Sequence, residues 1–413
     1  MGQVKKIKKC RISGSPKLKE IINLGQMALT GVFPLDKNAH LTKGPISLVW
    51  CEDSGLVQLA NSYDLNEMYG RNYGYRSSLN KSMIQHLEDK VNYLFNLIKF
   101  EKNDMVVDIG SNDGTLLNKI SFSNLTKVGI DPSAEKFIDY YNDDIDLLID
   151  FFPSKKFRKK YKFQKAKLIT SIAMFYDLES PSEFVKNIYN ILDVNGIWHF
   201  EQSYLLSMLK NNSYDTICHE HLEYYSLNVI NNLLIKNNLK IIDVHFNEIN
   251  GGSFAISAAR VDNKIYKPDN DKIEGIIDNE IKYGLNTLKP YENFYERVKK
   301  HKKDLKDLLY SLKKNNKKVF GYGASTKGNV LLQYCDITAD LIPLIAEVNK
   351  DKFGCFTPGS NIPIISESDA KAMKPDYFLV LPWHFKDHIL HKEKEFLAKG
   401  GKFIFPLPNI CVV

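Results

Sequence analysis

The chain of 413 residues lacks several features that would each assign it to a class of protein. It has no apolar run close to the roughly 20 residues that a membrane-spanning helix needs. It has only six cysteines and no Cys-x-x-Cys pair, so we expect most thiols to be reduced and buried. The basic N-terminus lacks the apolar segment of a signal peptide. These absences predict a cytoplasmic protein without a membrane partner.

An excess of charge of one sign is also missing. The net charge is only +7, with 56 basic and 49 acidic side chains. Two lysine-rich runs, 155–160 and 299–303, contain few aromatic residues and match no nucleic-acid-binding module, and such runs are usually solvated helix faces. We therefore predict no nucleic-acid partner. A mild positive field would suit an anionic small substrate.

Hydrophobic periodicity predicts three parts, and 44% hydrophobic residues are enough to pack them. Residues 1–78 indicate small strands and turns, and 80–99 a helix. Residues 104–260 alternate strands with helices in the pattern of a doubly wound α/β sheet. Its strands are expected at 105–109, 127–131, 166–171, 195–201, 239–244 and 253–260.

A second α/β unit follows a long charged stretch. Residues 268–315 have apolar positions at helical spacing, which predicts a connecting helix or helix pair. Strands are then expected at 318–320, 341–346, 362–365, 376–381 and 402–405. Each α/β unit begins with a strand followed by a glycine turn, which suggests two ligands or a duplication in which one copy changed role.

The first glycine turn is the most informative motif. A strand ends at Asp108, the turn contains Gly110, Asn112 and Gly114, and the next strand ends at Asp131, where a carboxylate can accept hydrogen bonds from ribose hydroxyls. The turn lacks the full G-x-G-x-x-G of a dinucleotide site. A ligand with adenosine but no phosphates therefore fits better, and S-adenosylmethionine (SAM) is the natural candidate. An ordinary βαβ unit with a glycine turn remains the alternative.

The same logic gives the rest of the expected cofactor pocket. Pro132 would flank the adenine, and the strand end at 171–176 would form the far wall through Ala173 and Met174. Plain core packing is the alternative role for Met174.

A second motif carries acid–base potential. Residues 218–221 read Cys-His-Glu-His, so that His219 and His221 flank Glu220. Histidine is the side chain best suited to move a proton near neutral pH, and a neighbouring carboxylate can orient it. A metal is less well supported, because an i, i+2 pair does not complete a tetrahedral set. A polar loop without catalytic function is the remaining alternative.

Taken in order along the chain, the motifs resemble those of the sugar C-methyltransferases that act on dTDP-4-keto-deoxysugars. They are Leu56–Leu59, Tyr73–Ser78, Val107–Gly114, Gly129–Pro132, His219–Ser226, Asn250–Ser253, Gly321–Asn329, Thr357–Gly359 and Leu381–His384. The resemblance implies a small zinc-binding type domain (1–78) and a class I SAM-methyltransferase domain with a Rossmann-like fold (79–262). Residues 263–413 would be connecting helices and a second Rossmann-like α/β domain that binds a nucleotide-diphosphate sugar.

The resemblance also implies roles for residues. His221 would be the base that removes a proton next to a ketone, Glu220 would orient it, and Tyr75 would donate to the oxyanion. In the last domain Lys327 would neutralise phosphate, and Tyr322 or Phe356 would stack on the base. The full substrate set is expected to be Tyr322, Ser325, Lys327, Asn329, Phe356 and His384. A glycine turn with a surface lysine is the alternative.

Two departures from the family pattern matter. Its two Cys-x-x-Cys pairs read Cys10-Arg-Ile-Ser13 and Cys51-Glu-Asp-Ser54 here, so we expect the first domain to fold without zinc and predict no metal site. Cys218 replaces a tyrosine of the C-methylating members, which leaves C-methylation in doubt.

Three other functions therefore stay open. They are O-methylation of a sugar hydroxyl, a non-catalytic sugar-nucleotide-binding protein, and an RNA methyltransferase, for which we find no convincing signature motif. The chain is expected to be a monomer or a weak dimer.

Overall fold

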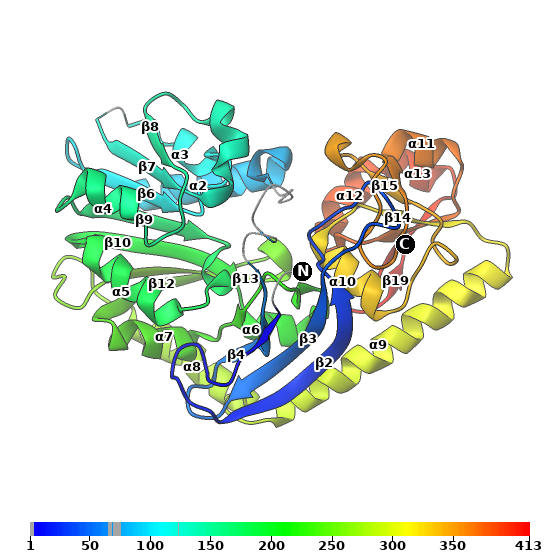
Figure 1. The fold of residues 1–413 in the computed structure, drawn as a ribbon, viewed down its shortest axis with the longest axis horizontal. Coiled ribbons are helices and arrows are strands. Elements are labelled where there is room, and N and C mark those ends of the chain that lie inside the picture. Colours follow the sequence, from blue (N-terminus) through cyan, green and yellow to red (C-terminus); the bar gives the residue numbers. More distant parts are fainter. Residues whose placement is uncertain (1–3, 65–67, 69–75, 123) are drawn as a thin grey trace.

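The computed structural model describes residues 4–64, 68, 76–122 and 124–413. Its first part is built on two long antiparallel strands, β2 (Leu18–Ala28) and β3 (Lys43–Cys51). The short strands are β1 (Lys5–Lys6), β4 (Val57–Leu59) and β5 (Asn61–Ser62). Strands β2 and β3 are longer than the small strands expected for residues 1–78. Their ends reach the last domain (Figure 1).

The central domain is a seven-stranded sheet in the order β12-β13-β10-β9-β6-β7-β8. Five strands are parallel and β13 runs antiparallel between β10 and β12. The predicted doubly wound, Rossmann-like sheet is confirmed. Its strands are β6 (Met105–Ile109), β7 (Thr126–Ile130), β8 (Ile145–Leu148), β9 (Ala166–Ile172), β10 (Leu192–Ser203), β12 (Leu239–Asn247) and β13 (Ser253–Arg260), and its helices are α2 (Lys81–Leu97), α3 (Thr115–Asn118), α4 (Lys155–Tyr161), α5 (Pro181–Ile191), α6 (Leu205–Lys210) and α7 (Leu227–Lys236).

Two helices connect this sheet to the last domain. They are α8 (Asn270–Tyr283) and α9 (Lys289–Lys314), which confirms the predicted helix pair. The long α9, yellow in Figure 1, runs beneath β2 and β3 toward the last domain. Its buried side chains, among them Phe294, Val298 and Leu305, lie at helical spacing.

The last domain is a six-stranded sheet in the order β16-β15-β14-β17-β18-β19. All its pairs are parallel except β18–β19. The strands are β14 (Val319–Tyr322), β15 (Ile345–Glu347), β16 (Ile364–Ser366), β17 (Tyr377–Val380), β18 (Lys402–Phe405) and β19 (Cys411–Val412), and the helices are α10 (Thr326–Tyr334), α11 (Glu367–Ala372), α12 (Lys386–Lys392) and α13 (Lys394–Ala398).

One strand crosses between domains. Strand β11 (Glu223–Tyr224), which follows the His-Glu-His motif, pairs with β4 and so extends the sheet of the first domain to the order β11-β4-β3-β2. The Leu59 N–H also donates to the Leu222 carbonyl at 2.8 Å. The motif is thereby anchored against the first domain. Among the described residues, no helix has the length and apolar character needed to cross a membrane.

Candidate active site

A cavity of about 360 Å³ opens at the carboxyl ends of β6, β7 and β9. In a parallel sheet these ends share one edge, which is where such folds bind ligands. Seven of the eight predicted cofactor residues line it: Asp108, Gly110, Asn112, Asp131, Pro132, Ala173 and Met174. The eighth, Gly114, begins α3 with φ +73°. Alanine there would bring Cβ within 2.8 Å of the Tyr141 ring, so the position requires glycine.

Asp131 is fixed by the turn that it faces. Its Oδ2 accepts the Asn112 N–H at 2.8 Å, and its Oδ1 accepts both the N–H and the hydroxyl of Ser133 at 2.6 Å. A carboxylate has about four acceptor positions. The N–H groups of Asn112, Ser133 and Ala134 and the Ser133 hydroxyl all bind this carboxylate, so a ribose hydroxyl would have to share or replace one of these bonds.

Asp108 is buried behind this carboxylate. Burial raises the pKa of Asp108 to about 7, the hydroxyl of Thr170 donating at 2.6 Å lowers it, and the charge of Asp131 raises it. Two buried carboxylates that repel each other are stabilised by a bound cation. SAM carries a sulfonium and an ammonium group, so the donor set of this cavity fits it.

Glu201 is an acid of the cavity wall that was not predicted. Glu201, in β10, is bound by His86 at 2.6 Å, Lys90 at 2.5 Å and the amide of Asn247 at 2.6 Å. Although burial raises its pKa, the hydrogen bond from His86 and the charge of Lys90 lower it to about 2. Like Asp108 and Asp131, Glu201 follows an apolar strand segment. A search for acids at such positions would have identified it.

The candidate base, His221, is half-buried and lies just before strand β11. Its Nδ1 donates to the Thr216 carbonyl at 2.8 Å, so Nε2 carries the free lone pair. Its ring packs against Tyr176, with 4.3 Å between the ring centroids. Burial, and then the charge of Lys327, lower the pKa of His221 to about 3, so the imidazole is neutral at physiological pH.

Glu220 stays a prediction as the residue that orients His221, although Nδ1 of the ring is held by the Thr216 carbonyl. Its carboxylate instead accepts from the hydroxyl of Thr30 at 3.3 Å and from the backbone of Gly31. Successive residues of an extended segment point in opposite directions, so the two side chains diverge. Burial raises the pKa of Glu220.

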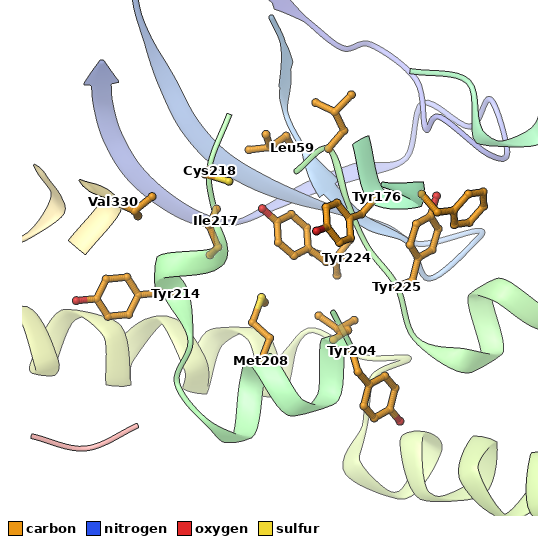
Figure 2. Packing of buried hydrophobic residues seen from close by; sticks show 14 of the residues in the cluster. Leu59, Tyr176, Tyr204, Met208, Tyr214, Ile217, Cys218, Tyr224, Tyr225 and Val330 are labelled. Atoms are coloured by element: carbon orange, nitrogen blue, oxygen red, sulfur yellow. The ribbon is translucent and has the colours of Figure 1, made fainter. Parts of the chain in front are cut away.

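His221 is not among the residues that line the cavity, and two of its neighbours are fully buried. His219 is 0% exposed. Its ring packs edge-to-face with that of Tyr63 in the first domain, with 4.7 Å between the ring centroids. Burial lowers its pKa to about 3, so the imidazole of His219 is neutral, and its catalytic role stays a prediction. Cys218 lies in the apolar cluster with Leu59 and Ile217 (Figure 2). Tyr75 lies outside the described residues.

Lys327 lies at the junction of the last two domains. Its Nζ donates to the Asn250 carbonyl at 2.7 Å; burial lowers the pKa of Lys327, and the charge of Asp215 opposes this shift only in part. Asp215 also accepts from the Trp383 indole at 2.8 Å. The Lys327 charge in turn lowers the pKa of buried His384. Lys327, Asp215 and His384 therefore form one polar group, and the charge of Lys327 also acts on His221.

Two predicted substrate residues make their contacts within the protein, and their binding role stays a prediction. The Tyr322 ring packs against Phe378 and Phe403, and its hydroxyl donates to Glu393. Asn329 is 0% exposed and donates to the Thr30 carbonyl at 2.7 Å. Sequence alone could not show that these polar groups meet partners within the protein.

The other two substrate candidates are placed at the same boundary. Ser325 caps α10 by accepting from the Gly328 N–H at 3.0 Å. Phe356 is half-buried, and its N–H donates to the Pro34 carbonyl at 2.8 Å. Segment 28–34 of the first domain thus contacts both the last domain and Glu220.

Comparisons with known proteins cover nearly the whole chain. Three family models match in order: "Putative zinc binding domain" over residues 10–69, "Methyltransferase domain" over 79–244 and "C-methyltransferase C-terminal domain" over 248–408. The C-methyltransferase NovU of Streptomyces niveus is 29% identical over 416 residues, which is 99% of this chain and 98% of that protein.

Two solved structures are similar in part. The structure of LepI with SAM has a TM-score of 0.35 and 13% identity, covering 45% of this chain and 54% of that one. A SAM-dependent methyltransferase from Clostridium acetobutylicum has a TM-score of 0.33 and 12% identity, covering 43% and 92%.

Proposed function

Because the chain belongs to the SAM-dependent C-methyltransferases, we propose that it methylates a carbon atom next to the ketone of a nucleotide-linked 4-keto sugar. SAM supplies the methyl group when it is bound. The class of substrate rests on the ordered motifs of the sequence. The chemistry rests on one observation, the tautomer of His221.

His221 would remove the proton from the carbon next to the ketone. Its Nδ1–H is held by the Thr216 carbonyl, so Nε2 is the free acceptor. A neutral imidazole can accept a proton at once, but a pKa of about 3 makes it a weak base. A bound anionic diphosphate would raise that pKa, because it would oppose the charge of Lys327. Substrate binding would thus activate the base.

The remaining residues would hold the two ligands. Asp131 would accept a ribose hydroxyl of SAM, and the ionised form of Asp108 would favour its positive charge. Lys327 and His384 would face the anionic substrate, and Tyr75 would donate to the enolate oxygen. The contacts between segment 28–34, Glu220 and α10 support this arrangement, since they close the side of the site that faces the first domain. Closure would exclude water from the enolate.

O-methylation of a sugar hydroxyl is the second candidate. Cys218 stands where C-methylating relatives are expected to carry a tyrosine, so the phenol of that tyrosine is missing here. The thiol of Cys218 is itself buried among apolar side chains. His221 could deprotonate a hydroxyl without that group.

The test is turnover with methyl-labelled SAM against matched nucleotide sugars, half with a 4-keto group and half fully hydroxylated. NMR then locates the new methyl. The proposal expects a carbon-bound methyl with keto sugars alone, whereas an oxygen-bound methyl would establish the second candidate. SAM binding without turnover on any member would favour a non-catalytic binding protein.

A further inference from the structure

The first domain contains two nearly identical tight turns, Cys10–Ser15 and Cys51–Leu56. In each, the cysteine carbonyl accepts the N–H of the glycine four residues on, Gly14 at 2.9 Å and Gly55 at 2.8 Å. Both glycines are left-handed, with φ +71° and +73°. The cysteine N–H donates to the carbonyl five residues on, at 2.8 and 2.9 Å. The two turns are therefore related by an approximate twofold symmetry.

The four side chains of these turns bind each other across that symmetry. Cys10 shares a hydrogen bond with Ser54 at 3.3 Å, and Ser13 shares one with Cys51 at 3.6 Å. In each turn the serine hydroxyl also accepts an N–H two residues on, from Ser15 and Leu56, at 3.3 Å. Both cysteines are buried. We call Cys10, Ser13, Cys51 and Ser54 the Cys–Ser ring.

This donor set does not fit zinc. A structural zinc takes four ligands from thiolates, imidazoles and carboxylates, and the ring supplies only two thiols. The two carboxylates between Cys51 and Ser54 are bound elsewhere, Asp53 to the Ser15 hydroxyl at 2.6 Å and to Lys17 at 2.9 Å, and Glu52 to Lys19 at 3.3 Å. Among the described residues no group of three or more His, Cys, Asp or Glu side chains could hold a metal ion.

We propose that the Cys–Ser ring replaces a metal ion, so that two paired hydrogen bonds join the turns of a domain that folds without zinc. The turns keep the geometry that four thiolates would need. Restoring cysteine at positions 13 and 54 would therefore recreate a zinc site.

The experiment compares the full-length wild type with Ser13→Cys/Ser54→Cys. Each is exposed to zinc sulfate, dialysed, analysed for metal by mass spectrometry, and unfolded thermally with and without EDTA. The wild type should retain far less than one zinc per chain and show no effect of EDTA. The double variant should retain one zinc per chain, and EDTA should lower its Tm by several degrees.

A second pair of substitutions keeps the test decisive if the cysteine variant does not fold. Ser13→Ala/Ser54→Ala removes both ring hydrogen bonds and adds no ligand, so its Tm should fall by a few degrees irrespective of zinc. The proposal is overturned by one tightly held zinc in the wild type, by a folded cysteine variant without zinc, or by an unchanged Tm in the alanine variant.

Discussion

At the scale of single residues, burial decides which protonation state each key group has. Burial and the charge of Asp131 bring the pKa of Asp108 near neutrality, and burial with the charge of Lys327 keeps His221 neutral. Both groups lie beside surfaces where a charged ligand is expected. A bound cation should therefore lower the pKa of Asp108, and a bound anion should raise the pKa of His221. The pH dependence of ligand binding should report both shifts.

SAM affinity should depend on pH through Asp108. A cationic ligand favours the ionised carboxylate, so affinity should rise with pH through about 7 and level off above it. As the pH falls below 7, Asp108 takes up a proton and affinity should drop by at most about tenfold per pH unit. Calorimetry from pH 6 to 8.5 measures this. Asp108→Asn should bind more weakly and lose the pH dependence; an identical profile in the variant would exclude Asp108 as its source.

Removing the imidazole should separate catalysis from binding. His221→Ala should lower kcat by about 10²–10⁴-fold, the usual contribution of a general base, with little change in SAM affinity. Thr216→Val is the matched control, because it removes the hydroxyl that lies 3.3 Å from Nδ1 but keeps the backbone carbonyl that accepts from Nδ1 at 2.8 Å. Steady-state kinetics and calorimetry check both. Near-normal turnover of His221→Ala would remove it from the base role.

At the scale of elements, segment 28–34 is the important connector. The hydroxyl of Thr30 donates to Glu220, and its carbonyl accepts from Asn329 in α10. Gln333, one turn later, makes two hydrogen bonds with the backbone of Ala28. The segment thus fixes the position of Glu220 against the last domain.

Gly31 allows this close approach. A Cβ at position 31 would lie 2.6 Å from Oε1 of Glu220, and the end of that side chain is the part that can move. Gly31→Ala should displace the carboxylate and disturb the Thr30–Glu220 contact that would close the site, and so lower kcat by about tenfold, or roughly 1.4 kcal/mol, with SAM affinity and Tm nearly unchanged. Gly275→Ala, where a Cβ meets open space in α8, should retain activity. Kinetics equal to wild type in Gly31→Ala would show that the position of Glu220 is not critical.

Sequence patterns predicted most elements because apolar periodicity is local. Strands β6 and β13 match the expected residues, and the helix pair is confirmed. Strand β8 was missed because its four residues, Ile-Asp-Leu-Leu, are flanked by acids and show little alternation. Strand β11 was missed because its partner is β4, more than 160 residues away in sequence. The limits of the three domains stay a prediction.

At the scale of the whole molecule, the site is assembled where three parts meet. The first domain contributes Thr30, the central domain His221 and Asp215, and the last domain Lys327 and Trp383. Seven of the eight cofactor residues predicted from the motifs line one cavity, since they follow successive strands. They did not predict Thr216, Thr30 or Asp215, because backbone acceptors and contacts between domains leave no local pattern.

The charge at this junction should matter for the substrate more than for SAM. Lys327→Met should raise KM for the nucleotide sugar by about tenfold or more, since a charged hydrogen bond contributes about 1.5–3 kcal/mol. SAM affinity, measured by calorimetry, should be retained. If KM stayed unchanged, the diphosphate would have to be held elsewhere.

The most direct test of the proposed chemistry is exchange of hydrogen at the carbon next to the ketone. A dTDP-4-keto-deoxysugar is incubated in D₂O with enzyme and S-adenosylhomocysteine, so that proton removal occurs without methyl transfer, and NMR follows the exchanging position. The account predicts exchange well above the rate without enzyme in the wild type, and none above it in His221→Ala. Carbon methylation of the same sugar by wild type with SAM, together with equal exchange in wild type and His221→Ala, would contradict it.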